Sequence, residues 1–164
     1  MPTPSPTASQ TPTSPLAGTW DTGPIPTGQV RAAIIAGGYT TAEADDFLRG
    51  LGWSKASHLE FNLNFYTEGG VPFVVQTGWN PDAGPMPTDG DHGPYELLAG
   101  NEVAITSADP SINKYREVFS YSIAGDRLTL HVVGETNPDL TPEELRLDER
   151  LLLAMAAAPL MKND

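Results

Sequence analysis

Apolar and polar residues alternate along the middle of the chain. The alternation is clearest in residues 57–66, where every second residue from Leu59 to Phe65 is apolar and those between are polar. Successive side chains of a β-strand point to opposite faces, so a period of two predicts a strand with one buried face. The buried face of this strand is expected to carry Leu59, Phe61, Leu63 and Phe65.

Six further segments have the composition or the period of strands. They are residues 17–22, 71–79, 94–100, 101–107, 114–123 and 128–133. Turn-forming sequences such as Thr-Glu-Gly-Gly and Ala-Gly-Asp-Arg separate several of them. In the second segment the alternation predicts one face made of Phe73, Val75, Thr77 and Trp79.

Two short helices are predicted directly after the first strand. Apolar residues recur at helical spacing in residues 27–38, which favours a helix with Thr27 as its N-cap and Gly37 at its end. Thr40 and Glu43 have the spacing of a capping box, which indicates the start of a second helix. Two helices in immediate succession form a helical hairpin.

A third helix is predicted near the C-terminus. Thr141 is suited to the N-cap, Pro142 to the first helical position, and Glu144 to the partner position of a capping box. Pro159 is expected to end the helix. The apolar stripe along this helix is typical of a helix that packs on a core.

The order of these elements predicts a mostly β fold. About seven consecutive strands with short connections and one buried face favour an antiparallel up-and-down arrangement. A flat sheet of this size would leave both edges and one apolar face uncovered. We therefore expect a closed β-barrel with a helical hairpin after the first strand and a C-terminal helix.

Residues 1–15 differ from the rest of the chain because they are almost entirely Pro, Thr and Ser. Such a segment cannot bury a core and is predicted to be disordered, with polyproline-like stretches. One interpretation is a plain linker or terminus, and the other is an export-related tether. The globular domain is predicted to span residues 16–164.

Composition limits the partners. The formal net charge is −12, so phosphate backbones and anionic membrane surfaces should be repelled, whereas neutral or cationic ligands remain compatible. The absence of cysteine excludes disulfides and thiolate chemistry. Neither an apolar run of transmembrane length nor a signal-peptide pattern is visible. Oligomeric state is left open.

Gly18, Thr19 and Trp20 form a Gly-x-Trp motif on the first predicted strand. With the helical hairpin, the run of strands and the terminal helix, this motif resembles the calycin superfamily of lipocalins and fatty-acid-binding proteins. The sequence pattern from Tyr95 to Leu130 and the Pro/Thr/Ser-rich tether are similar to those of lipocalin-like bacterial lipoproteins. The resemblance implies an exported or surface-tethered protein, although the lipid-modified cysteine of such lipoproteins is not in this chain.

The same resemblance implies roles for particular residues. Trp20 would close one barrel end beneath an arginine, for which Arg127 is the candidate. The hairpin, residues 27–50, would act as a lid over the other end. An Arg-x-Tyr pair that binds fatty-acid carboxylates has no clean match here, so a fatty-acid ligand is not implied.

The apolar strand faces have two interpretations, a solid core or the lining of a ligand cavity. The aromatic share and the predicted hairpin favour a cavity. The candidate lining residues are Ile34, Phe47, Phe61, Leu63, Phe65, Phe73, Val75, Trp79, Tyr95, Phe119, Tyr121 and Leu130.

Other chemistry-bearing residues favour simpler interpretations. Asp82, Asp89, Asp91 and His92 lie in a turn-rich loop without a calcium-binding ligand pattern, so a plain loop is expected. The three histidines are scattered, and no Gly-x-Ser-x-Gly motif is present. Neither a metal nor a cofactor is predicted.

Three functions follow from these features. The first is non-enzymatic binding of a small, largely apolar ligand inside the barrel of an exported protein. The second is a solid-core interaction module of an exported complex. The third is an enzyme that uses Tyr115, Glu117 and Tyr121, for which clustered buried groups with shifted pKa values would be the sign.

Overall fold

The computed structural model describes residues 13–88, 90–109, 111 and 114–163. Its strands are β1 (Gly18–Asp21), β2 (Ile25–Pro26), β3 (His58–Glu68), β4 (Val71–Trp79), β5 (Asp91–Leu98), β6 (Glu102–Thr106), β7 (Arg116–Ala124), β8 (Arg127–Thr136) and β9 (Leu160–Asn163). Its helices are α1 (Thr27–Ala36), α2 (Thr41–Gly50) and α3 (Pro142–Met155). Most of the predicted tether, residues 1–15, lies outside the described residues.

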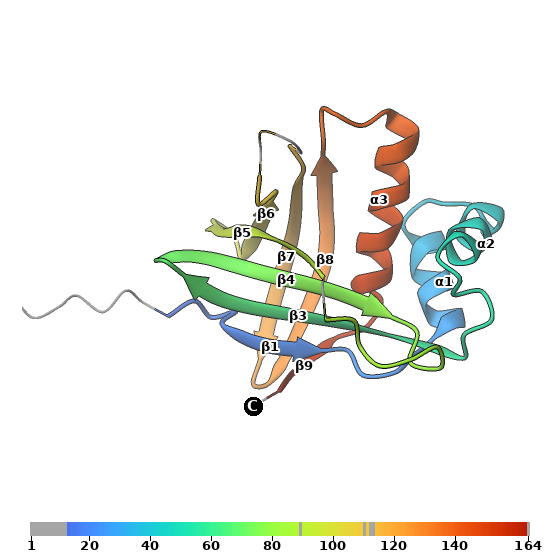
Figure 1. Cartoon of the computed structure of the whole chain (residues 1–164), viewed down its shortest axis with the longest axis horizontal. Helices are drawn as coiled ribbons and strands as arrows, with labels where there is room; N and C mark the ends of the chain where they lie inside the picture. Colours follow the sequence, from blue (N-terminus) through green and yellow to red (C-terminus); the bar gives the residue numbers. More distant parts are fainter. Residues whose placement is uncertain (1–12, 89, 110, 112–113, 164) are drawn as a thin grey trace, which may run out of the picture.

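Eight of the described strands close into an antiparallel barrel (Figure 1). Each strand from β3 to β8 pairs with the next one along the chain, and β9 then pairs with both β8 and β1. The ring closes because β1 also pairs with β3, with Trp20 opposite Leu63. The short β2 pairs with β3 outside this ring. The predicted mostly β barrel is therefore confirmed.

The closing strand β9 is absent from the sequence prediction. Its register places Lys162 opposite Trp20 and Leu160 opposite Leu128. Only Leu160 of its four residues is buried, so the segment has no alternation that could indicate a strand. A short strand with paired neighbours on both sides gains its hydrogen bonds from the barrel rather than from local preference.

The two ends of the barrel are built differently. Tight turns join β3 to β4, β5 to β6 and β7 to β8 at one end, which we call the hairpin end. The opposite end, which we call the helical end, carries α1, α2, α3, the end of β4 and the end of β6. The longer connections of the helical end give it room for a site.

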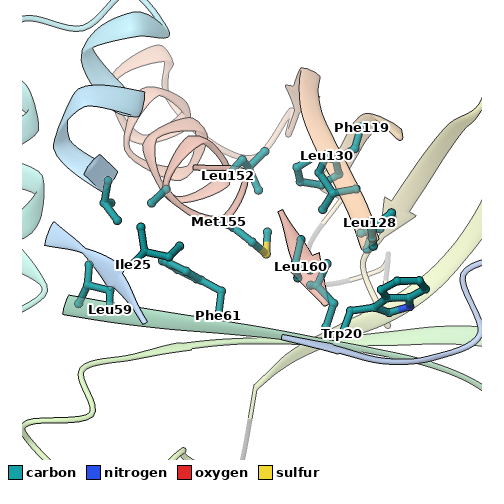
Figure 2. Close-up of a cluster of buried hydrophobic side chains, with 14 of the residues drawn as sticks. Trp20, Ile25, Leu59, Phe61, Phe119, Leu128, Leu130, Leu152, Met155 and Leu160 are labelled. Atoms are coloured by element: carbon teal, nitrogen blue, oxygen red, sulfur yellow. The ribbon is translucent and has the colours of Figure 1, made fainter. Parts of the chain in front are cut away.

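One apolar core fills the barrel and extends to the helices. Figure 2 shows Trp20, Leu128 and Leu160 gathered in one part of it. Leu152 and Met155 project from α3 into the same cluster and, like Phe61, are buried. α3 is thus part of the core rather than a separate appendage, as its apolar stripe predicts.

The prediction of which face of β4 joins the apolar core is wrong. The register places Val74 opposite Phe65 and Gln76 opposite Leu63, and directly opposed residues lie on the same face of a sheet. Val74, Gln76 and Gly78 therefore face the interior, whereas Phe73, Val75 and Trp79 face outward. Phe73 instead stacks on Tyr66, with ring centroids 6.0 Å apart.

The predicted helix starts are confirmed for α2 and α3. Thr40 Oγ1 accepts a hydrogen bond from the Glu43 amide, and the Glu43 carboxylate accepts one from the Thr40 amide at 2.8 Å. Thr141 and Glu144 make the same reciprocal pair. The cap predicted for α1 is wrong, because Thr27 is its first helical residue and its hydroxyl donates to the Ala56 carbonyl at 2.6 Å.

Replacing Thr141 with alanine is expected to lower the free energy of unfolding by about 1 kcal/mol, because the substitution removes the side-chain acceptor for the Glu144 amide. Urea denaturation followed by circular dichroism measures this loss. Thr41→Ala is the matched control, since Thr41 is an exposed first-turn residue of α2 and not its cap. Equal effects of the two substitutions would contradict the capping role.

Although α1 of the helical hairpin touches β3, α3 is the helix with the larger contact with the barrel. It contacts β8 on one side and α1 on the other, and α2 stands farther out (Figure 1). Arg146 forms an ion pair with Glu43 at 2.8 Å, and Arg150 donates to the Glu43 carbonyl. These bonds connect α2 to α3, so the three helices form a layer at one side of the helical end.

Candidate functional site

A cavity of about 450 Å³ opens at the helical end of the barrel. Strands β3 and β4, the start of β5, α3 and the segment that follows α2 form its wall. The lining residues are Leu51, Trp53, Phe61, Gln76, Thr77, Gly78, Pro87, Gly90, Asp91, Leu151 and Met155. A neighbouring hollow of about 320 Å³ between α2 and α3 shares Leu51 and Leu151 with it.

One wall of the cavity is aromatic. The Trp53 and Phe61 rings meet edge to face with centroids 5.9 Å apart, and Phe47 supports Trp53 from α2 in the same manner. Gly78 makes this packing possible, since a Cβ at this position would lie 2.7 Å from the Phe61 ring. Trp53 and Phe61 thus form a fixed apolar surface.

A second side of the cavity is polar and lies between β4 and β5. Gln76 and Asp91 are directly opposed in the register, so both side chains lie on the inner face. The Gln76 Nε2 group donates a hydrogen bond to Glu117 Oε2 at 2.8 Å. Gln76 therefore connects the cavity to a carboxyl group on β7.

Glu117 belongs to a cluster of carboxyl groups beneath α3. It lies opposite Glu135 in the β7–β8 pairing, and Asp148 approaches both from α3. Burial raises the pKa of Glu117 to about 7, and the charges of Asp91 and Asp148 act in the same direction. Burial and the charges of Asp148 and Glu117 raise the pKa of Glu135 to about 8.

Among the residues that the structure describes, no carboxyl group of this cluster forms an ion pair. The ion pairs there are Arg31–Asp45, Arg49–Asp46, Arg116–Glu96 and Arg146–Glu43. One oxygen of Glu135, Oε2, is buried and has no hydrogen-bond partner in the described part of the chain. The carboxyl cluster beneath α3 is therefore acidic, and none of its members forms an ion pair within the described part of the chain.

The structure distributes the predicted lining residues between the core, the cavity and the outer surface. Of the twelve candidates, Phe61 lines the main cavity and Phe47 the neighbouring hollow. The core holds Ile34, Leu63, Phe65, Tyr95, Phe119 and Leu130, with Tyr121 packed against it. The outward-facing Phe73, Val75 and Trp79 do not line the barrel interior.

The cation that packs on Trp20 is also different from the arginine that the resemblance implies. Trp20 is 1% exposed, and its indole N–H donates to the Leu16 carbonyl at 2.8 Å. The cation over its ring is Lys162, with Nζ 5.5 Å from the centroid, whereas Arg127 is exposed at the start of β8. The unpredicted strand β9 supplies this lysine, which explains the different partner.

Of the three residues proposed for a barrel enzyme, two lie close together and the third lies apart from them. Burial and the charge of Glu117 raise the pKa of the Tyr115 phenol, so these two groups share one environment. Tyr121 lies four residues farther along β7, toward the hairpin end. The expected sign of shifted pKa values is therefore present at Tyr115 and Glu117.

Several residues that line the cavity were not predicted to bind a ligand. Gln76 and Asp91 are polar residues on a predicted strand and in a predicted loop, where solvent exposure is the default. Trp53 lies three residues beyond the end of α2, and only the fold turns it toward Phe61. Of the other acidic residues in the predicted loop, Asp82 accepts hydrogen bonds from the Ser57 hydroxyl and amide. Asp89 lies outside the described residues.

Searches against protein-family models, curated proteins and solved structures find no match for this chain. In the described part of the chain, no helix combines the length and apolar character needed to cross a membrane. Groups of three or more side chains placed to hold a metal ion are also absent from the described residues.

Proposed function

We propose that this protein binds a small, largely apolar molecule in the cavity between α3, β3 and β4. The cavity volume of about 450 Å³ carries the proposal, because small-molecule sites typically measure roughly 300–1,000 Å³. Its wall combines apolar side chains with a few polar groups, which is the usual composition of such sites.

The distribution of packing inside the barrel supports binding at the helical end. Trp20, Leu128 and Leu160 pack around the hairpin-end half, and each is at most 1% exposed. The hollow lies at the other end, beside α3. An eight-stranded barrel is wide enough either to fill with side chains or to hold one small ligand, and this chain combines the two arrangements.

The closed antiparallel barrel is compatible with a calycin-like ancestry, from which a binding role would follow. In this arrangement α3 and the segment after α2 border the ligand, in place of the helical hairpin itself. Leu151 and Met155 come from α3, and Leu51 and Trp53 follow α2. Display outside the cell stays a prediction that depends on residues 1–15.

Titration with the neutral fluorescent dye N-phenyl-1-naphthylamine tests the proposal. We expect saturable binding of one dye per chain, with fluorescence enhanced by the apolar wall. Leu51→Trp should weaken binding about tenfold or more, equivalent to about 1.4 kcal/mol, because the larger side chain would enter the cavity. Trp53→Ala should also weaken binding, since it removes half of the aromatic wall.

Leu97→Trp is the matched control for the first substitution. Leu51 and Leu97 are 45% and 42% exposed, but only Leu51 lines the cavity. Wild-type affinity in Leu97→Trp together with weakened binding in the two cavity variants would support the site. Unchanged dye affinity in both cavity variants would place the dye elsewhere and contradict the proposal.

A further inference from the structure

We propose that the cavity selects ligands that carry a protonated amine on an apolar body, with Asp91 and Gln76 receiving the amine. The inference rests on the proposed function and names the ligand class for the same cavity. It follows from the hydrogen-bonding and charge character of the polar wall, together with the aromatic wall beside it.

The polar wall offers acceptors to a ligand. The Gln76 amide is oriented by its hydrogen bond to Glu117, in which the N–H group points at the carboxyl oxygen. The Gln76 carbonyl oxygen is thereby turned away from Glu117 and remains an acceptor. The Asp91 carboxylate, also an acceptor, lines the cavity directly opposite Gln76 in the register. A ligand that meets both groups must donate hydrogen bonds.

The charge around this wall favours a cation among donors. Glu117, Glu135 and Asp148 lie close enough to Asp91 or to one another for each to raise a neighbour's pKa. None of these four carboxyl groups takes part in an ion pair among the described residues. Asp91 is exposed, but Glu117, Glu135 and Asp148 beside it are partly buried. Ionised carboxyl groups in such a position are costly without a cation, so an ammonium group bound at Asp91 would relieve a repulsion that no described ion pair offsets.

The rest of the cavity suits the apolar body of such a ligand. Trp53, Phe61 and Met155 offer apolar contact next to the polar wall. The face of an indole also attracts a nearby cation through its ring quadrupole. An acidic ligand would instead place its carboxylate beside Asp91 and Glu117, and repulsion would weaken its binding.

Isothermal titration calorimetry at pH 8 with octylamine, 1-octanol and octanoate tests this inference, because the three probes share one chain and differ at the head. We expect octylamine to bind about tenfold more tightly than 1-octanol, and octanoate to bind most weakly. Asp91→Asn should remove most of the amine preference, because it should weaken octylamine binding much more than 1-octanol binding. The charge-matched control is Asp126→Asn, in the exposed turn of the hairpin end, which should retain the preference.

The outcomes separate this inference from the proposed function. Equal affinities for octylamine and 1-octanol, or a preference that survives in Asp91→Asn, would overturn the amine selectivity while cavity binding stands. Tightest binding of octanoate would overturn it as well. If none of the three probes binds while the naphthylamine dye still binds in the cavity, the amine inference alone is wrong. If neither the dye nor the probes bind, the proposed function itself is wrong.

Discussion

Replacing Trp20 with alanine is expected to lower the free energy of unfolding by about 3–5 kcal/mol, the usual cost of truncating a large buried aromatic side chain. The indole is 1% exposed and donates to the Leu16 carbonyl, so the substitution leaves both a void and an unpaired carbonyl. Whole domains are stable by only about 5–15 kcal/mol. Urea denaturation followed by circular dichroism should therefore show a large fall in the midpoint.

Trp79→Ala is the matched control for this prediction, since Trp79 is the last residue of β4 and lies half-buried on the outer face. Its loss should cost clearly less than the loss of Trp20. Lys162→Ala should cost less than about 1 kcal/mol, because the lysine is exposed to solvent and a solvated cation over an aromatic ring contributes little. Equal losses for the two tryptophans would contradict the larger packing contribution of the buried Trp20.

Local signals in the sequence were sufficient for most of the fold. The capping boxes at Thr40 and Thr141 identified the starts of α2 and α3, because these motifs are satisfied within four residues. The alternation of β3 also identified its buried face, with Leu59 to Phe65 in the core. Signals of this kind depend on short stretches of chain, so they can be read without knowing the tertiary structure.

Features that depend on distant pairing were not predictable in the same way. The two faces of β4 could not be distinguished because Val74 and Val75 are both apolar, and only the pairing with Leu63 and Phe65 decides between them. The strand β9 has one buried residue and takes its place from β1 and β8. Barrel closure thus determined both the partner of Trp20 and the inner face of β4.

The sequence indicated the end of the barrel that carries the candidate site, but few of its residues. Function was expected opposite Trp20, and the cavity lies there. Its polar wall joins Gln76, Asp91 and Glu117 from three strands that are not all adjacent in the barrel. In the sequence of a single strand, polar residues on an inner face look the same as surface residues. The alternation of apolar residues therefore does not identify them.

Deprotonation of the carboxyl cluster should make the fold less stable as the pH rises. Burial raises the pKa of Glu117 to about 7, with Asp91 and Asp148 as further causes. A carboxyl group whose pKa is higher in the folded than in the unfolded state contributes most stability below its unfolded pKa. That contribution is lost as the pH rises through the folded pKa. Between pH 5 and pH 8, the free energy of unfolding should therefore fall.

Glu117→Gln isolates the contribution of this residue, because glutamine is uncharged and can still accept the hydrogen bond from Gln76. Near pH 5 the variant and the wild type should be about equally stable, since Glu117 is then protonated. At pH 8 the variant should be more stable by about 1–3 kcal/mol, because each unit of pKa shift corresponds to about 1.4 kcal/mol. Urea denaturation at the two pH values measures the difference. Glu68→Gln, at the exposed end of β3, should show no such gain. A stability difference for Glu117→Gln that is the same at both pH values would contradict the titration of Glu117 between pH 5 and pH 8 in the folded protein.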